Sequence, residues 1–528
     1  MTFRQLAAIP LVMTIACTAR DTDDAGNAPA VSGPRPAPEV VAQAVDSLAT
    51  RVLAEGLTPA LGVAVVMDGQ PILTKSYGYA DATHRVPADS NTLWYLASTS
   101  KSYTGFGIAL LAHQGALNFN TPIASLLPNA QWPRGYDASK QTLADFLSHT
   151  HRLRDRAVVM NSSFTASIPE SEWPKLLRFA ETTSKRNLEY SNLGYNVAAM
   201  VIDTKRPEGW RAYLDSAVYK PAGMSNTYTR MSGIDASRIA TTHELRADGT
   251  YATSPFYKID ATMSSAGGHL ATLHDLARWI TVQMDSGKVD GKRVFPPEAV
   301  ALSHRMIAEQ TVDDRKRFAY FDRKGWGAGW DIGFYEGEPM VSRFGGYSST
   351  RSHLSFLPRR RIGVVAQTNG ELGAGATDII AAFAYDLERG DPNARATAQR
   401  RLQKLTAARP EALAAVAQND SVRAARRQRP LRRPATDFAG SYHHEWYGTI
   451  TFEAHGNEVH YQWGAIAGVA DVLDARSCHW FRCSYSNALR IDVGDSGNSV
   501  QFYFPDVGPA TGLELKGEKF TRLPGHSP

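Results

Sequence analysis

The stretch YLASTSKSYTG, residues 95–105, places Ser98 three residues before Lys101, where an apolar pattern becomes helical. Residues three apart on a helix lie on the same face. A helix N-terminus offers a positive dipole and free backbone N–H groups, so a serine there can attack a carbonyl while its own N–H helps to hold the oxyanion. A neighbouring lysine can take the serine proton when burial lowers the lysine pKa. The spacing therefore indicates a nucleophile and its base, against the commoner alternative that a serine at a helix start only caps the helix.

Two further motifs follow along the chain. YSNLGYNVAAMVID gives Tyr190, Ser191 and Asn192 before an amphipathic helix, and FGGYSSTRSHLSFLPRRRIGVV gives Gly345 and Gly346 at the start of a strand. In this order the motifs resemble those of the serine β-lactamases and penicillin-binding proteins, most closely the class C β-lactamase and D-peptidase/esterase group. The segments LADFLSHTHRL, YKPAGMSNTY and SSAGGHLATLHDLARW resemble other stretches of that family. The resemblance covers roughly residues 40–390, and the combination is specific although each motif alone is weak.

The resemblance implies a role for each matching residue. Ser98 would be the acylated nucleophile, Lys101 its base partner and Tyr190 a proton shuttle. Asn192 would hydrogen-bond the substrate amide. The backbone N–H groups of Ser98 and Gly346 would form the oxyanion hole. Outside this context, Tyr190 would be interpreted as a core aromatic residue that opens a helix.

Arg343 departs from the family pattern. It stands two residues before Gly345, where the family usually has lysine or histidine. An arginine stays protonated and cannot shuttle a proton, but its planar fork can bind a carboxylate. Nucleophilic attack by Ser98 is unaffected by this change, whereas the tuning of Tyr190 and the anionic group of the substrate are put in doubt. The same departure argues against assigning β-lactamase activity from the motifs alone.

The chain of 528 residues is too long for one compact core, so two or more domains are expected. Residues 39–392 are predicted to form a β-lactamase/transpeptidase-like α/β (α+β) domain with an antiparallel sheet and a helical subdomain. Its first hairpin turns at Asp68-Gly69. The other predicted elements are an opening helix at residues 39–56, a buried strand at 361–370 and a closing helix at 376–389.

From Phe438 onward the sequence consists of short alternating segments, which predict a small antiparallel barrel or sandwich. GTITFEAHGNEVHYQW is a predicted hairpin that turns at residues 455–457. The stretch FAGSYHHEWYGTITF resembles the lipocalin-like domain found after this catalytic domain in some relatives, and we place that domain at residues 434–526. Four of its aromatic residues are interpreted as core, with ligand binding as the alternative: Trp446, Tyr461, Trp463 and Trp480.

A basic segment at residues 393–433 separates the two predicted domains. It holds 11 arginines or lysines against two acidic residues, a net charge of +9, whereas the whole chain carries +5. The segment has no aromatic residue, although nucleic-acid binding usually needs aromatics interleaved with basic groups. We therefore expect a solvated helical linker and no nucleic-acid partner, with contact to a membrane surface or an anionic polymer as the alternative.

The N-terminus predicts export. An apolar run, LAAIPLVMTIAC, has the length of a signal-peptide core and ends at Cys17. The end resembles a bacterial lipoprotein cleavage site, apart from Thr14 where leucine is usual, so lipidation of Cys17 and plain secretion both stay open. Residues 1–17 would be the signal and residues 18–38 a flexible tether, which places the protein in the periplasm or at the cell envelope.

Two further cysteines, Cys478 and Cys483, lie five residues apart. Export would let them form a local disulfide, and two partly buried thiols are the alternative. No Cys/His zinc pattern is present in the sequence. His443-His444-Glu445 is interpreted as the end of a surface strand, because the His-Glu-x-x-His pattern is absent.

The predicted function is hydrolysis of an amide or ester bond through a Ser98 acyl-enzyme, with no metal and no organic cofactor. The resemblance implies a small-molecule or peptide-like substrate such as a D-amino acid derivative, and transfer to an amine is an alternative to hydrolysis. A true β-lactamase and a non-catalytic penicillin-binding-like sensor are the competing hypotheses. The sequence predicts no oligomeric state, and a membrane contact is expected only through an N-terminal lipid anchor.

Overall fold

The computed structural model describes residues 33–184, 188–254, 258–315, 320–427, 429–473, 488–493 and 496–524. These residues divide into two compact units. The larger unit comprises residues 33–163 and 171–413, and the smaller unit comprises 164–170 with the residues from 414 onward. The predicted domain boundaries at residues 392 and 433 stay predictions.

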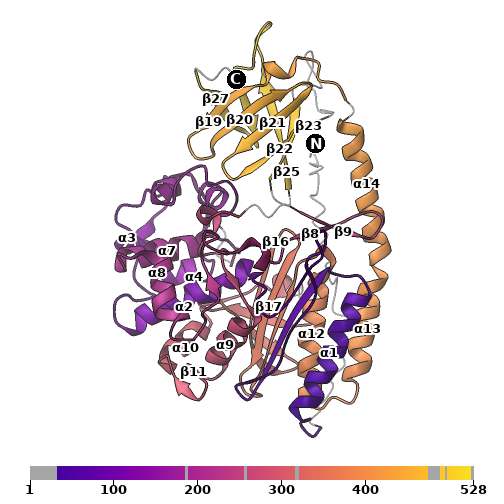
Figure 1. Cartoon of the computed structure of the whole chain (residues 1–528). Helices are drawn as coiled ribbons and strands as arrows, with labels where there is room; N and C mark the ends of the chain where they lie inside the picture. The colour runs from indigo at the N-terminus through magenta and orange to yellow at the C-terminus, as the bar shows by residue number, and fades with distance from the viewer. Residues whose placement is uncertain are drawn as a thin grey trace. The chain divides into compact units, whose positions relative to one another are not determined.

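The centre of the larger unit is a nine-stranded sheet in which every paired strand is antiparallel (Figure 1). The strands, in their order across the sheet, are β13 (Ala308–Glu309), β14 (Asp322–Trp326), β15 (Asp331–Tyr335), β16 (Glu338–Tyr347), β17 (Thr350–Leu357), β18 (Ile362–Thr368), β1 (Ala60–Met67), β2 (Gln70–Asp81) and β3 (Val86–Pro87). Strands β1 and β18, which lie near the middle, are buried along their whole length. This arrangement confirms the predicted antiparallel sheet and the predicted buried strand at β18.

The first hairpin turns at Asp68 and Gly69, as predicted. Both residues have positive φ, 52° and 81°, which is the backbone geometry of a two-residue type I′ turn. Met67 pairs with Gln70 across the turn. An Asp-Gly pair tolerates these angles, so the turn sets the register of the hairpin locally.

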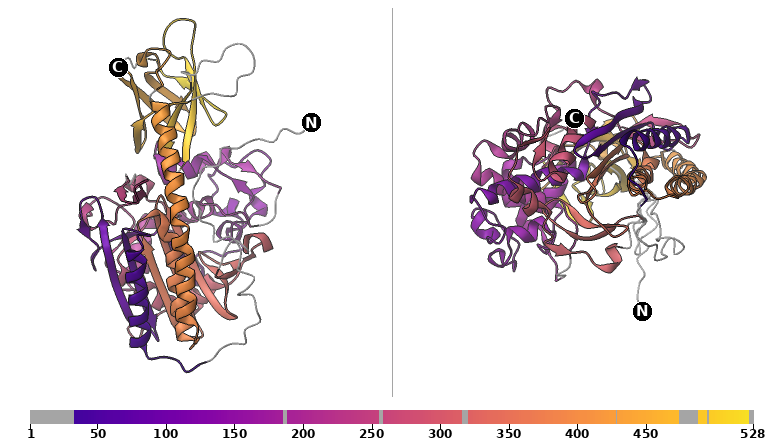
Figure 2. Two further views of the ribbon diagram at one scale, coloured as in Figure 1. Left: turned by 90° about the vertical axis from the view of Figure 1, so that its right-hand side faces the viewer. Right: turned by 90° about the horizontal axis from the view of Figure 1, so that it is seen from below.

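Helices cover both faces of this sheet. On one face α1 (Pro38–Ala54), α12 (Ala374–Glu388) and α13 (Ala394–Ala407) lie side by side (Figures 1 and 2). On the other face α9 (Leu273–Met284) packs on β1 and β18. The opening and closing helices predicted from the sequence correspond to α1 and α12.

The remaining helices form the helical part of the fold. They are α2 (Lys101–His113), α3 (Ile123–Leu126), α4 (Leu143–Leu147), α5 (Ala157–Met160), α6 (Trp173–Leu176), α7 (Leu193–Lys205), α8 (Gly209–Leu214), α10 (Pro297–His304) and α11 (Val312–Arg315). The last helix, α14 (Arg409–Arg427), belongs mostly to the smaller unit. Helix α2 is central, since its residues from Lys101 to Leu111 are all buried. Gly105 permits this packing, because a Cβ there would come within 2.2 Å of the Ala328 carbonyl oxygen. None of the described helices is both long enough and apolar enough to cross a membrane.

Short strand pairs complete the larger unit. They are β4 (Trp94–Tyr95), β5 (Leu153–Arg154), β6 (Glu181–Thr182), β7 (Thr227–Tyr228), β8 (His243–Leu245), β9 (Tyr251–Thr253), β10 (Leu270–Ala271), β11 (Lys288–Val289) and β12 (Lys292–Arg293). Strand β10 pairs with both β4 and β7.

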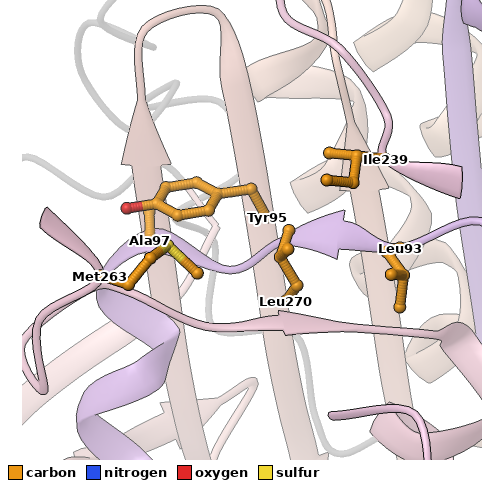
Figure 3. Close-up of a cluster of buried hydrophobic side chains, with 6 residues drawn as sticks. All are labelled: Leu93, Tyr95, Ala97, Ile239, Met263 and Leu270. Carbon is orange, nitrogen blue, oxygen red and sulfur yellow. The ribbon is translucent and has the colours of Figure 1, made fainter. Parts of the chain in front are cut away.

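A compact apolar cluster lies beside these strands (Figure 3). Its members are Leu93, Tyr95, Ala97, Ile239, Met263 and Leu270. Ala97 belongs to the 3₁₀ turn η1 (Ala97–Ser100), which leads directly into α2. The cluster therefore fixes the turn that carries Ser98.

The smaller unit is a second nine-stranded antiparallel sheet. Its strands, in order, are β22 (Ile466–Val469), β21 (Glu458–Trp463), β20 (Gly448–His455), β19 (Gly440–His444), β27 (Glu518–Arg522), β26 (Gly512–Leu515), β25 (Ser496–Tyr503), β24 (Ala488–Val493) and β23 (Asp471–Val472). In the described residues β22 and β23 stand at its two ends, so closure into a barrel and the lipocalin likeness stay predictions.

Two features of the smaller unit were anticipated in the sequence. The hairpin of β20 and β21 turns where predicted, with His455 paired to Glu458. Trp446, Tyr461 and Trp463 are buried, as core residues should be. The segment 164–170 also belongs to this unit, and the Ala465 N–H donates to the Thr165 carbonyl at 2.7 Å.

Several predictions fall outside the described residues. Cys17, Cys478, Cys483 and Trp480 all lie there, so the signal, the lipid anchor and the disulfide stay predictions. Most of the basic segment is helical, as α13 and α14, whereas its described residues 429–433 are not.

Candidate active site

Ser98 occupies the 3₁₀ turn that immediately precedes α2. Its neighbours Ala97 and Thr99 are buried, whereas Ser98 itself is partly exposed. Ala97 has a φ of 46°, a left-handed conformation that is uncommon for a residue with a Cβ. The turn thus projects one hydroxyl from an otherwise buried stretch, in the position expected of a nucleophile.

Lys101 is fully buried and its ammonium group has three acceptors. Nζ lies 3.1 Å from Ser98 Oγ, 2.7 Å from Asn192 Oδ1 and 2.7 Å from the Ala266 carbonyl oxygen. Burial lowers the pKa of Lys101; Tyr190 opposes this shift, and the Arg343 charge adds to it. The amine is therefore easier to deprotonate than that of an exposed lysine.

Tyr190 lies on the other side of the nucleophile, in the turn before α7. Its Oη is 2.6 Å from Ser98 Oγ, and its ring centroid is 5.0 Å from Lys101 Nζ. The side chain as a whole is 47 % exposed, but the hydroxyl lies within this hydrogen-bonded group. Burial alone would raise the pKa of Tyr190; the Lys101 and Arg343 charges outweigh that effect, and the pKa is lowered. The phenol is thus poised to give up or accept a proton.

Arg343 is inside the site and is only 2 % exposed. From β16 it donates through Nη2 to Tyr190 Oη at 2.9 Å and through Nε to the Ser98 carbonyl oxygen at 2.9 Å. Its third nitrogen, Nη1, donates to Asp331 Oδ2 at 3.1 Å. All three guanidinium nitrogens therefore have a partner within the protein. The predicted role of Arg343 as a carboxylate receptor stays a prediction.

Gly345 lets β16 approach the nucleophile turn. A Cβ at this position would come within 2.2 Å of the Leu96 carbonyl oxygen and 3.0 Å of the Ser98 nitrogen. Gly346, the next residue, is exposed. The strand thus brings the predicted second N–H of the oxyanion hole to the side of Ser98, although the hole itself stays a prediction.

The structure brings together all seven residues singled out for chemistry in the larger unit. They are Ser98, Lys101, Tyr190, Asn192, Arg343, Gly345 and Gly346. They come from three places far apart in the sequence: the turn before α2, the turn before α7, and β16. Their roles in catalysis stay predictions.

Sequence reasoning missed several residues that hold this group in place. Asp331 is fully buried and anchors Arg343, and the Ala266 carbonyl accepts from Lys101. Asp331 could have been noticed in the sequence, because it is an acidic residue between the apolar residues Trp330 and Ile332. A backbone carbonyl leaves no such signal in the residue types.

His149 stands directly behind Tyr190. Its ring centroid lies 4.7 Å from that of Tyr190 and 4.4 Å from that of Trp326. Its Nδ1 accepts from the Ser191 N–H at 3.2 Å. Burial lowers the pKa of His149 well below its usual value, and the Lys101 charge lowers it further. His149 is thus a neutral support for the turn that carries Tyr190.

His443 and His444, in the smaller unit, have separate partners. His443 Nδ1 lies 3.1 Å from Thr449 Oγ1, and His444 Nε2 lies 3.5 Å from Glu518 Oε2. Across the described part of the chain, no three histidine, cysteine, aspartate or glutamate residues are placed to hold a metal ion.

This geometry suits acyl transfer. A partly exposed hydroxyl is in contact with an amine and a phenol, and both of these groups have lowered pKa values. Either can take the hydroxyl proton as the oxygen attacks a carbonyl.

Comparison with known proteins finds a family that matches most of the larger unit. The family described as Beta-lactamase matches residues 45–387, more than half of the chain. Protein flp of Staphylococcus aureus (strain COL) is 23% identical over 333 residues, which cover 62% of this chain and 63% of that protein. The chain therefore spans less than two thirds of that relative's own length.

Two solved structures share the fold. An octameric penicillin-binding protein homologue from Pyrococcus abyssi has a TM-score of 0.57 and 17% identity, and the match covers 90% of this chain and 98% of that one. The D-amino acid amidase from Ochrobactrum anthropi SV3, solved with L-phenylalanine amide, has a TM-score of 0.54 and 18% identity, covering 69% of this chain and 99% of that one.

Proposed function

This chain belongs to the β-lactamase family of serine hydrolases, and on that premise we propose that it hydrolyses an amide or ester bond through an acyl-enzyme on Ser98. One observation carries the proposal: Ser98 Oγ is 3.1 Å from Lys101 Nζ and 2.6 Å from Tyr190 Oη. A nucleophile within hydrogen-bond reach of its base is the arrangement that covalent catalysis requires.

Each step of the reaction has a group to perform it. Ser98 Oγ bonds to the carbonyl carbon as its proton passes to Tyr190 or Lys101, and the carbonyl electron pair becomes the oxyanion. The bond to the leaving group then breaks, and the leaving group takes that proton. A water molecule attacks the resulting ester, gives its proton to the same pair, and the freed Ser98 oxygen regains a proton. The net change is the addition of one water across the amide or ester bond.

The substrate we propose is a D-amino acid or peptide-like amide or ester. The D-amino acid amidase with the same fold supports this class. Asn192 accepts from Lys101 through Oδ1, and we propose that its amide nitrogen donates to the substrate. Transfer of the acyl group to an amine in place of water follows the same chemistry.

We also propose that the protein acts after export to the periplasm, either free or anchored through a lipid on Cys17. The apolar run that ends at Cys17 and the polar stretch after it support this location. In that compartment Cys478 and Cys483 would form a disulfide. Mass spectrometry of the exported protein, with and without reductant, would measure both modifications.

A true β-lactamase is the second candidate. The Lys101 and Tyr190 pair beside Ser98 supports it equally well, because penicillins also acylate a serine activated in this way. The two candidates differ in whether a penicilloyl ester on Ser98 is hydrolysed quickly or persists.

The testing experiment is intact-protein mass spectrometry of the chain from residue 18 onward. The protein is incubated with a fluorophosphonate probe and, separately, with benzylpenicillin, and Ser98→Ala is the control. We expect the probe adduct on the native protein alone. Free hydrolysed penicillin would favour a β-lactamase, whereas a stable adduct would favour the amidase or esterase. No adduct and no product would bring the penicillin-binding-like sensor forward.

Ser98→Ala is a clean control because the serine side chain contacts Lys101 and Tyr190. The N-cap position of α2 is Ser100. We expect the free energy of unfolding to change by no more than about 1 kcal/mol, the usual scale for a serine at a helix start. Loss of the folded state in this variant would instead make Ser98 a structural residue.

A further inference from the structure

The environment of Arg343 is unusual because two guanidinium groups share one carboxylate. Asp331 Oδ2 accepts from Arg343, while Oδ1 accepts from Arg323 and from Gln310. Arg323, Asp331 and Arg343 are 7 %, 0 % and 2 % exposed. Buried ions normally persist only when they are paired and hydrogen-bonded. Asp331 is therefore divided between two guanidinium groups, and the Arg343 charge is not matched by a carboxylate of its own.

One edge of the Arg343 guanidinium faces Tyr190. Arg343 Nη2 donates to Tyr190 Oη at 2.9 Å, while its Nε is held by the Ser98 carbonyl. The guanidinium also stacks over Trp326, with Cζ 4.5 Å from the ring centroid. Hydrogen bonds and packing thus fix it on every side, in the orientation that favours a phenolate at Tyr190.

The other charged and titratable groups around Tyr190 point the same way. Lys101 faces it from α2 with a positive charge, and His149 faces it as a neutral ring. Behind Arg343, both oxygens of Asp331 are occupied, and Asp378 also acts on the Arg323 charge. A negative charge on Tyr190 would balance the Arg343 and Lys101 charges that face it.

The same contacts leave Arg343 poorly placed for substrate. Its side chain is 3 % exposed, and each of its three nitrogens already donates within the protein. A substrate carboxylate would have to displace Tyr190 or Asp331 to gain the two parallel hydrogen bonds that make arginine recognition strong.

We propose that Arg343 is a positioning residue for the Tyr190 proton shuttle, supported by Asp331 and Arg323, and not the receptor of a substrate carboxylate. This inference rests on the proposed function, since the state of Tyr190 matters to catalysis only if Ser98 is acylated. The substrates would then be amides and esters that the site recognises without binding a carboxylate on the leaving group.

A titration of Tyr190 tests the proposal without any need for activity. The absorbance of the phenolate is followed against pH, and the spectrum of Tyr190→Phe is subtracted to isolate one tyrosine. We expect Arg343→Gln to move the transition to higher pH by about one unit or more, because a cation within hydrogen-bond distance shifts a pKa by that amount. Arg343→Lys keeps the charge and should restore much of the shift.

The matched control is Arg361→Gln. It removes the same charge from the turn between β17 and β18, where Arg361 pairs with Asp285 and Asp68. This variant should leave the Tyr190 transition in place. Asp331→Asn tests separately whether Asp331 supports Arg343, and circular dichroism establishes whether this variant folds. If it does not fold, the two Arg343 variants decide whether Arg343 lowers the pKa of Tyr190.

A matched pair of substrates tests the specificity claim. N-benzoyl-glycyl-thioglycolate and its methyl ester differ only in a carboxylate on the leaving group. We expect Arg343→Gln to lower kcat/KM for both by the same factor, within about twofold, because each loses the same Tyr190 function. A loss at least about tenfold larger for the free acid would overturn the proposal and make Arg343 a carboxylate receptor.

The outcomes separate this inference from the proposed function. If the native protein does not acylate at all, the proposed function fails, and the inference about catalysis fails with it. If the native protein acylates but the Tyr190 transition is the same in native and Arg343→Gln protein, only the inference fails.

Discussion

At the scale of single residues, Lys101 and Tyr190 can both take the Ser98 proton, and each shifts the pKa of the other. Each is the charge partner of the other, since Tyr190 raises the pKa of Lys101 and Lys101 lowers that of Tyr190. Ser98 lies between them and is in contact with both. The pH at which Ser98 becomes reactive therefore belongs to the pair.

Removing Lys101 or Tyr190 should shift the pH dependence of acylation, and the direction of the shift tells which group remains. Lys101→Met takes a positive charge away from Tyr190, so the pKa of Tyr190 rises and the acid limb of acylation moves to higher pH. Tyr190→Phe takes away the group that raises the pKa of Lys101, so the acid limb moves to lower pH. We expect each variant to acylate about 10²- to 10⁴-fold more slowly, the usual contribution of a general base.

The measurement is the second-order rate of labelling by an uncharged fluorophosphonate across the pH range. For the native protein we expect the half-maximal rate below pH 10, the ordinary pKa of tyrosine. Shifts in the same direction for both variants would contradict mutual coupling of the pair.

The sequence anticipated the members of this site but not what holds them. Ser98, Lys101 and Tyr190 lie in motifs whose order can be recognised along the chain. Asp331 reaches Arg343 only because β15 pairs with β16 on one side and with β14 on the other. β15 and β16 are joined by a two-residue turn at Glu336 and Gly337, both with positive φ, so this register is set locally, but the hairpin was not among the elements anticipated.

At the scale of elements, the site depends on how closely β16 approaches the turn before α2. Gly345 is the point of approach, since a Cβ there would meet the Leu96 carbonyl oxygen at 2.2 Å. The three atoms nearest to such a Cβ are all backbone atoms of residues 96–99, so no flexible side chain could move away. At the adjacent Gly346, the nearest atoms that a Cβ would meet belong to the Arg351 side chain, the first at 3.2 Å.

Gly345→Ala and Gly346→Ala form a matched pair that tests this approach. We expect Gly345→Ala to push β16 away from Ser98, lowering the free energy of unfolding by about 1–3 kcal/mol and acylation at least tenfold. Gly346→Ala should cost less in stability, because the Arg351 side chain can shift. Denaturant unfolding and the labelling rate would be measured for both. Equal stability of the two variants would show that the approach is not tight.

Local elements were the best anticipated part of the fold. The Asp68-Gly69 turn and the hairpin ending at His455 depend on residues that are neighbours in sequence. The start of α2 was less well anticipated: Ser98 sits in a 3₁₀ turn, and the α-helix begins at Lys101. The positive φ of Ala97 is imposed by packing around it, so the sequence alone could not indicate it.

At the scale of the whole molecule, the sequence predicted two domains joined by a basic helical segment. The change from long mixed elements to short alternating strands is a property of composition, and it is visible without any structure. The assignment of residues 164–170 to the smaller unit was not anticipated. It depends on contacts such as the one between Thr165 and Ala465, about 300 positions apart in the sequence, that no pattern near residue 165 reveals.

The larger unit should be sensitive to acid because it buries neutral histidines. His149, His151 and His269 are at most 1 % exposed. Burial lowers the pKa of all three, to about 4 for His151 and about 3 for His269. Below pH 6.5 the unfolded chain binds protons that the folded chain does not, so stability falls as the pH drops. Each histidine contributes about 1.4 kcal/mol per pH unit.

His151→Gln measures how much of this acid-dependent loss of stability comes from His151. The amide oxygen can still accept from the Leu153 N–H, as His151 Nδ1 does at 3.2 Å, but it binds no proton between pH 5 and 6.5. Urea unfolding of native and variant protein, followed by tryptophan fluorescence at pH 7, 6 and 5, gives the slopes. We expect the variant to lose about 1.4 kcal/mol less per pH unit below pH 6.5. His113→Gln, at an exposed position, is the control and should keep the native slope. Parallel slopes for His151→Gln and native protein would mean that His151 is protonated in the folded state, and the acid sensitivity would then need another source.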